Sequence, residues 1–196
     1  MTVCFATNNA HKISEVQALL GGGIRLLSLK AIGCEAELPE ETDSLEGNSQ
    51  QKAQFVFKNF HCSCFADDSG LEVFAIGGEP GVHSAHYAGP ERDAAKNIEK
   101  LLRKLEGITD RRARFRAVIT LTTPGVMRQF EGSVPGVILT APRGSGGFGY
   151  DPVFLPDGYS QTFAEMTVGE KNKFSHRAVA VNQLVDFLKH HPAALH

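Results

Sequence analysis

The chain has 196 residues, of which 42% are hydrophobic and 21% are charged. This length suits one well-buried core, and we expect a single domain over residues 1–196. A formal net charge of −2 gives no excess positive charge to attract long nucleic acid, and no apolar run approaches membrane-spanning length. The first residues lack the basic flank and apolar core of a signal peptide, so we expect a cytoplasmic protein without nucleic-acid or membrane partners.

The four cysteines are scattered along the chain and do not form a disulfide framework or a zinc-ligand spacing. They are Cys4, Cys34, Cys62 and Cys64. A chain of this size does not need disulfides to fold. We therefore predict reduced thiols that are buried or half-buried.

The chain opens with a strand over residues 3–7 and a helix over residues 12–20, which has apolar side chains at helical spacing. The loop between them, Thr7-Asn8-Asn9-Ala10-His11-Lys12, is polar and leads into the helix N-terminus. Unpaired amides at such a terminus favour anions, and Lys12 adds a positive charge. The glycines of a Walker loop are missing, so an ordinary helix cap is the alternative.

A strand over residues 24–29 is followed by an acidic segment over residues 35–46. Asp43 and Glu46 have the spacing of a capping box for the next helix, in which Asn48 and Lys52 lie one turn apart. Glu40-Glu41-Thr42 lies just upstream. These polar groups are expected at one cleft, although spacing alone does not establish it.

The stretch Phe65-Ala66-Asp67-Asp68-Ser69-Gly70-Leu71 has two adjacent carboxylates between two apolar runs. We predict a strand, a tight turn at Ser69-Gly70 and a second strand, because a bend would let both aspartates reach one cleft. Mg²⁺ prefers a few carboxylates together with water and substrate phosphates, which such a site could supply. An Asx-type turn without metal is the alternative.

Further along, residues 93–105 form a predicted helix, and residues 111–122 alternate as in a half-buried antiparallel strand. Residues 126–131 and 137–139 are predicted as two more strands. Gly144-Ser145-Gly146-Gly147-Phe148-Gly149-Tyr150-Asp151-Pro152 matches G-x-G-x-x-G, but a strand is expected after it where a dinucleotide fold requires a helix. The loop could instead approach a flat ligand on which Phe148 stacks, or be a plain glycine turn.

Near the C-terminus, Thr167 and Glu170 form a possible capping pair ahead of Lys171. Ser175-His176-Arg177 lies near the start of the last helix. Basic groups usually lie at the other end of a helix, so this placement suggests an anionic or acceptor-rich ligand. A surface His-Arg pair is the alternative.

Taken together, these motifs resemble the inosine triphosphate pyrophosphatase family, which acts on noncanonical purine nucleoside triphosphates. The resemblance runs in order from residue 3 to about residue 188, and it also includes Gly81 through Ser84. Gly47 is a departure, because family members usually carry glutamate before Asn48.

The resemblance implies a mixed α/β fold with an elongated central mixed sheet, flanking helices, and two lobes around a nucleotide-binding cleft. It also implies a homodimer and Mg²⁺-dependent hydrolysis of ITP, dITP and XTP to the monophosphate and pyrophosphate, which removes them from the nucleotide pool. Thr7 through Lys12 together with Lys52 would hold the triphosphate. Glu40 and Asp68 would bind Mg²⁺, and Asp68 and Glu41 would serve in catalysis.

The resemblance further assigns Ser69 to the nucleotide and Phe148 through Asp151 with Lys171 to the base and sugar. His176 and Arg177 would read the base. A nucleotide-binding sensor without turnover is the main rival hypothesis, although it would not need a metal and a base. A nicotinamide-dependent dehydrogenase is disfavoured by the strand expected after Gly149.

Overall fold

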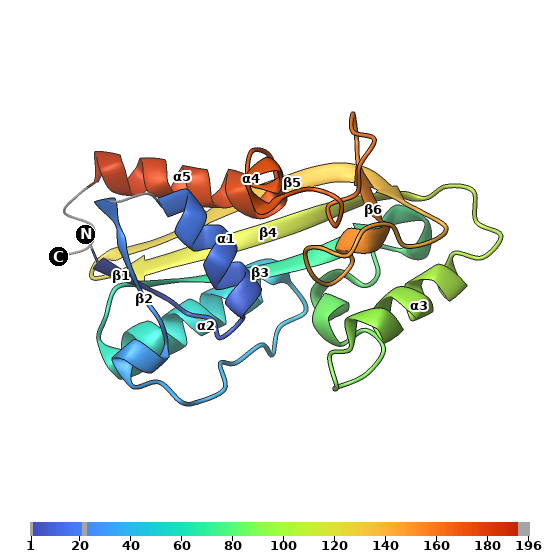
Figure 1. The fold of residues 1–196 in the computed structure, drawn as a ribbon. Coiled ribbons are helices and arrows are strands. Elements are labelled where there is room, and N and C mark those ends of the chain that lie inside the picture. Colours follow the sequence, from blue (N-terminus) through green and yellow to red (C-terminus); the bar gives the residue numbers. More distant parts are fainter. Residues whose placement is uncertain (1, 21–22, 192–196) are drawn as a thin grey trace. The chain divides into compact units, whose positions relative to one another are not determined.

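The computed structural model describes residues 2–20 and 23–191. Figure 1 shows one mixed sheet with strand order β2-β1-β3-β4-β5-β6. The strands are β1 (Thr2–Phe5), β2 (Arg25–Leu27), β3 (Cys64–Val73), β4 (Arg112–Thr123), β5 (Val126–Ile138) and β6 (Phe154–Pro156). The α-helices are α1 (Ala10–Leu20), α2 (Leu45–Phe60), α3 (Ala94–Lys104), α4 (Val168–Lys171) and α5 (His176–His190). Strand β1 is parallel to β2 and β3, whereas β5 and β6 are antiparallel, which confirms the mixed α/β fold.

The chain forms two compact units. Unit 1 contains Met1–Asp68, Ala117–Gly132 and Arg177–His196, and unit 2 contains Ser69–Arg116 and Ser133–His176. Each of β3, β4 and β5 therefore contributes one part to unit 1 and one part to unit 2. The assignment of residues 1–196 to one domain stays a prediction.

The core of unit 1 has two layers because successive strand residues point to opposite faces of the sheet. Val3, Phe5 and Phe65 pack with side chains of α1 and α5, and the Phe5 and Phe65 rings stack with centroids 4.6 Å apart. Cys64 and Ala66 pack instead with side chains of α2. Figure 1 accordingly shows α1 and α5 on one face of these strands and α2 on the other.

The α2 layer also contains all four cysteines. Cys4, Cys34 and Cys64 are buried, Cys62 is half-buried, and all four are free thiols. Burial raises the pKa of Cys4 to about 12, with nearby Cys62 adding to the effect. The prediction of free thiols that are buried or half-buried is confirmed. Thiols held in the protonated form are poor nucleophiles.

The core of unit 2 gathers around α3. Ile98, Leu101 and Leu105 pack with the end of β3 and with aromatic side chains that include Phe115 and Phe154. The side chain of Asp93 accepts a hydrogen bond from Lys96 N and caps the helix. The predicted helix over residues 93–105 is thus confirmed apart from its first and last residues.

The C-terminal predictions also agree with the structure. Thr167 and Glu170 form the capping box of α4, and α5 begins at His176. The glycine loop is followed by the short 3₁₀ turn Asp151–Val153 and then by β6. This order excludes a helix directly after the glycines, as expected.

The turn predicted at Ser69-Gly70 is wrong, because β3 is one continuous strand of ten residues. Gly70 has a different purpose from bending the chain. A Cβ at this position would lie 2.2 Å from Gly81 O, so glycine is needed where two backbones approach closely. The two aspartates therefore lie within a strand.

Two other predictions of element boundaries are also wrong. Ser44 caps α2, and its hydroxyl accepts a hydrogen bond from Gly47 N, so Asp43 is not the cap. The strands predicted over residues 126–131 and 137–139 are one strand, β5. Pro135 of β5 comes just before Gly136–Ile138, the residues that pair with β6. The missing N–H of Pro135 therefore removes no hydrogen bond from that pairing.

Within the described residues, none of the helices is long and apolar enough to cross a membrane.

Candidate active site

The predicted phosphate loop forms the N-terminus of α1 in unit 1. Asn9 caps this helix, since its Oδ1 accepts from His11 N at 3.0 Å and from Lys12 N at 3.2 Å. Thr7 Oγ1 in turn accepts from Asn9 N. Asn8, Asn9, Ala10 and His11 are exposed, so the ordinary cap and an accessible helix N-terminus coexist.

Two lysines from different helices meet at one backbone carbonyl of β3. Lys12 Nζ on α1 lies 3.4 Å from Asp67 O, and Lys52 Nζ on α2 lies 2.9 Å from the same oxygen. Both side chains are largely buried. Two ammonium groups held this close concentrate positive charge, which a polyphosphate could neutralise.

The two aspartates between these lysines point to opposite faces of β3 and have different partners. Asp67 continues the face of Phe65 toward α1 and α5, where its Oδ1 accepts from Lys12 Nζ and its Oδ2 from Arg177 Nε. Asp68 continues the face of Ala66 toward α2, where its Oδ1 accepts from Lys52 Nζ at 2.9 Å. A continuous strand thus separates two neighbouring carboxylates.

Asp67 is held as a carboxylate. Burial alone would raise its pKa, but Arg177 and Lys12 outweigh burial and lower the pKa well below its usual range. Arg177 is 1% exposed, and its Nη1 also pairs with Glu15 on α1. Both oxygens of Asp67 are engaged, so this residue organises the lysine and the arginine around it.

The pKa of Asp68 is shifted in the opposite direction. Burial raises its pKa, and the attraction of Lys52 and Lys12 only partly offsets that effect. Its Oδ2 is buried, and the described part of the chain offers it no hydrogen-bond partner. A buried carboxylate oxygen without a donor suits a metal ion or a reacting water, because leaving it unpaired is unfavourable.

Glu40 shares the ammonium group of Lys52 with Asp68. Glu40 Oε1 lies 2.6 Å from Lys52 Nζ, so a carboxylate from the segment before α2 and one from β3 contact the same cation. These two carboxylates raise the pKa of Lys52 even though burial acts to lower it. Glu41 is exposed and contacts α2 through its backbone N–H.

The other predicted nucleotide contacts lie in unit 2. Asp151 Oδ2 accepts from Phe148 N at 2.9 Å and from Lys171 Nζ at 2.7 Å, and both members of this ion pair are almost fully buried. Lys171 Nζ also lies 5.1 Å from the centroid of the Phe148 ring. A Cβ on Gly147 would lie 2.1 Å from Asp151 Oδ2, so this glycine allows the loop to wrap around the carboxylate.

The remaining predicted residues of unit 2 lie in this loop, on β3 and at the start of α5. The Tyr150 hydroxyl donates to Ser84 O, and the ring of His176 stacks on Phe115 with centroids 4.8 Å apart. Gly149 adopts a positive φ of 60°, and Ser69 is half-buried on β3. The structure therefore gathers Phe148, Tyr150, Asp151 and Lys171 within unit 2.

Sequence reasoning missed Glu15 as a member of the charged cluster in unit 1. It is 6% exposed and pairs with Arg177, 162 positions further along the chain. A weak signal was present, because Glu15 lies three residues after Lys12 and so shares its side of α1. A single acidic residue on a helix that also carries apolar groups does not by itself identify a buried partner.

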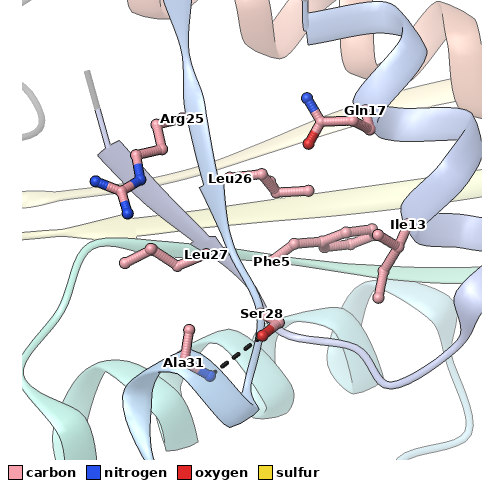
Figure 2. Close-up of a pocket in the computed structure, with 8 residues that line it drawn as sticks. All are labelled: Phe5, Ile13, Gln17, Arg25, Leu26, Leu27, Ser28 and Ala31. Carbon is pink, nitrogen blue, oxygen red and sulfur yellow. Dashed lines mark hydrogen bonds between the residues drawn. The ribbon is translucent and has the colours of Figure 1, made fainter.

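A separate cavity in unit 1 lies between α1 and β2, and its volume is about 270 Å³. Figure 2 shows the aliphatic chains of Ile13 and Leu26 beside Phe5, with Ser28 accepting a hydrogen bond from Ala31 N. The cavity is lined by Phe5, Ile13, Gln17, Arg25, Leu26, Leu27, Ser28 and Ala31. None of these residues is a predicted site residue.

The carboxylates fit a magnesium ion that also uses water and substrate as ligands. Within the described ranges, no group of three His, Cys, Asp or Glu side chains could hold a metal. Mg²⁺, however, is usually bound through one or two carboxylates together with waters and phosphates. Glu40 and Asp68, which share the ammonium group of Lys52, match that smaller set of ligands.

Comparison with known proteins places this arrangement in a family. The model of the Ham1 family matches residues 3–187. The chain is 50% identical to a dITP/XTP pyrophosphatase of Porphyromonas gingivalis over 94% of this chain and 95% of that protein. It is 45% identical to a dITP/XTP pyrophosphatase of Thermus thermophilus, over 98% and 94% of the two chains.

Solved structures agree with these matches. The Ham1 protein of Staphylococcus aureus superposes with a TM-score of 0.89 at 36% identity, over 97% of this chain and 99% of that one. A HAM1 protein from Coxiella burnetii gives the same TM-score at 34% identity and the same coverage. With the family model spanning nearly the whole sequence, the chain belongs to the Ham1 family, as the motifs around Lys12, Asp68 and Arg177 predicted.

Proposed function

We propose that the chain hydrolyses noncanonical purine nucleoside triphosphates, namely dITP, XTP and ITP, to the monophosphate and pyrophosphate. The names of relatives that share 43–50% of its residues over nearly the full length support this reaction. The observation that carries the proposal is the convergence of Lys12, Lys52 and Asp68 in unit 1. Removal of such nucleotides from the pool before their incorporation into DNA or RNA is the corresponding role.

The lysines and the start of α1 supply the electrophilic part of the site. Displacement at phosphorus depends mainly on positioning and charge neutralisation. Lys12 and Lys52 would bind phosphate oxygens, and the exposed residues Asn8 through His11 would present the helix N-terminus to the same anion. Asp67 keeps Lys12 in place through their ion pair.

Asp68 would accept the proton of the attacking water. Burial raises its pKa, so its carboxylate is a stronger base than that of an exposed aspartate. Its Oδ2 is the atom available for that proton. Glu41 stays a second candidate for catalysis on the basis of the family resemblance.

Magnesium is proposed as the cofactor, with Glu40 and Asp68 as its ligands. When bound, the ion would polarise the phosphate and offset its negative charge. Lys52 contacts both carboxylates and would keep them oriented toward each other. This assignment is supported by the donor set rather than by a preformed cage of ligands.

The base and sugar are assigned to Ser69, Phe148 through Asp151, Lys171 and His176. Hypoxanthine and xanthine carry a 6-keto acceptor where adenine carries a donor, so donors facing that position favour inosine and xanthine over adenine. A mismatched donor leaves a buried polar group unpaired, at about 1–3 kcal/mol per group. Arg177 stays a candidate for base recognition on the basis of the family resemblance, and its burial against Asp67 and Glu15 supports a positioning role as well.

We further propose a homodimer that acts in the cytoplasm. Both assignments rest on the family resemblance. Light scattering coupled to size-exclusion chromatography will give the mass of the assembly, which is expected at twice the 21.2 kDa of one chain. A monomer at micromolar concentration would contradict the dimer.

The test of the reaction is a product assay on ITP, dITP, XTP, ATP and GTP with Mg²⁺. We expect the first three to be cleaved much faster, with pyrophosphate detected directly by ³¹P NMR. Release of orthophosphate would show attack at a different phosphorus atom. Binding of ITP without any product would favour the sensor hypothesis.

A further inference from the structure

A segment without regular secondary structure, Glu40-Glu41-Thr42, is held along α2 by side chains of that helix. Gln51 Oε1 accepts a hydrogen bond from Glu41 N at 2.9 Å. Asn48 Oδ1 accepts from Thr42 N at 2.9 Å, and it is also an acceptor for the Thr42 hydroxyl at 2.9 Å. Consecutive backbone amides of the segment are therefore fixed by two side chains one helical turn apart.

Gly47 makes this close approach possible. A Cβ at Gly47 would lie 2.3 Å from Thr42 Oγ1 and 2.8 Å from Thr42 Cβ. Glycine in a helix is unfavourable by about 0.5–1 kcal/mol relative to alanine, so its presence here needs a packing reason. Any larger residue would require Thr42 to move.

These contacts are not needed to cap the helix. Ser44 already caps α2 through Gly47 N. Gln51 lies beyond the first turn, and its acceptor is directed at the Glu41 amide. The hydrogen bonds from Gln51 and Asn48 thus stabilise the segment more than the helix.

The consequence concerns Glu40, which directly precedes the fixed amides. Its carboxylate is 38% exposed and contacts Lys52, one turn after Asn48 on α2. A partly exposed ion pair contributes little by itself to holding a flexible side chain. The hydrogen bonds to the Glu41 and Thr42 amides therefore hold Glu40 in place more firmly than its ion pair with Lys52 does.

We propose that Gly47, Asn48 and Gln51 are positioning residues that hold Glu40 beside Lys52 and Asp68 and so set the affinity of this site for a divalent cation. The cation part of the inference rests on the proposed function. Groups that orient a metal ligand typically change metal affinity by about 10–100-fold when removed. Loss of the Gln51 acceptor is expected to lie at the lower end of that range, because Asn48 would still hold Thr42.

The experiment compares Gln51→Leu, Gln51→Glu and Gln50→Leu in the full chain. Gln51→Glu keeps an acceptor for the Glu41 amide. Gln50→Leu makes the same change on the same helix, at a side chain that has no hydrogen bond or ion pair to the other described residues. Circular dichroism and the thermal midpoint establish that each variant is folded.

The first measurement is hydrogen exchange at the Glu41 and Thr42 amides by NMR, without any cation. We expect Gln51→Leu to lose the protection of the Glu41 amide, and Gln51→Glu and Gln50→Leu to retain it. The second measurement is Mn²⁺ binding without nucleotide, followed by electron paramagnetic resonance. Gln51→Leu should bind Mn²⁺ about 10-fold more weakly, with the other two variants close to the unmodified chain.

Unchanged protection of the Glu41 amide in Gln51→Leu would overturn the proposal. Lost protection with unchanged Mn²⁺ affinity would also overturn it, because Glu40 would then not depend on the segment for its effect. If the predicted exchange and Mn²⁺ results are obtained but the unmodified chain releases no pyrophosphate from ITP or XTP, the positioning role is supported and the proposed reaction fails.

Discussion

Replacing Arg177 by methionine tests the buried charge network of unit 1. The change leaves Asp67 and Glu15 without their shared partner, and the three side chains are 0%, 8% and 1% exposed for Asp67, Glu15 and Arg177. Breaking a buried pair by removing one member destabilises a protein by about 3–5 kcal/mol. Against a typical unfolding free energy of about 5–15 kcal/mol, Arg177→Met should bring the protein near its stability limit.

The assay is equilibrium unfolding in urea at pH 7, with Arg143→Met as the matched control. Arg143 pairs with Glu165 at 3.1 Å, but the side chains are 44% and 30% exposed, so its loss should cost only about 0.2–1 kcal/mol. If Arg177→Met costs no more than Arg143→Met, Arg177 is not buried in this network and the reasoning fails.

The dependence of folding stability on acidic pH gives an independent check on the same network. The folded-state pKa of Asp67 lies below its ordinary value of 3.8, so between these two values the unfolded chain binds a proton that the folded protein does not. Stability from Asp67 is therefore present above pH 3.8 and is lost as the pH falls toward the folded pKa. In Arg177→Met this slope should be smaller, because the strongest stabiliser of the Asp67 carboxylate is absent.

The remaining predictions concern other positions. Asp68→Asn should lower turnover by about 10²–10⁴-fold. Its thermal midpoint at pH 7 should be equal or higher, because the raised folded-state pKa of Asp68 makes its carboxylate unfavourable at neutral pH. This gain should vanish below the ordinary aspartate pKa of 3.8. A large drop in the midpoint would contradict the burial argument. Lys171→Met should cost about 3–5 kcal/mol in urea unfolding, because the buried Asp151 carboxylate loses its cationic partner. Lys171→Met combined with Asp151→Leu should cost less, and additive losses would argue against a coupled pair. Gly136→Ala should cost about 1–3 kcal/mol, because its Cβ would lie 2.4 Å from Leu155 O, whereas Gly169→Ala, with open space around it, should be neutral or stabilising.

Much of the fold could be predicted because its signals are local. Helical spacing identified α1, α2, α3 and α5, and strand alternation identified β4. The errors occurred where a long-range contact decides the local structure. Gly70 suggested a turn, but a glycine is needed there because the backbone of Gly81, at the start of the 3₁₀ turn Gly81–His86, approaches it closely, and the sequence around Gly70 does not reveal this contact.

The same difference between local signals and long-range contacts applies to the candidate site. Lys12, Lys52 and Asp68 could be selected from motif chemistry, and the structure brings them together. The ion pairs of Arg177 with Asp67 and Glu15 could not be predicted, because those two residues are 110 and 162 positions away along the chain. No periodicity or cap links positions so far apart, and burial is decided by packing of α1 and α5 on the same face of the sheet.

The wrong prediction of a turn at Ser69-Gly70 changes the interpretation of the two aspartates. A turn would have placed both carboxylates in one cleft, where like charges would compete for the same cations. The continuous strand sends Asp67 to the α1 and α5 face, where Arg177 and Lys12 lower its pKa, and Asp68 to the α2 face, where burial raises it. Neighbouring carboxylates whose pKa values are pushed apart can have different roles. Asp67 then serves as a permanent anion that holds Lys12, and Asp68 is the one with an oxygen available for chemistry.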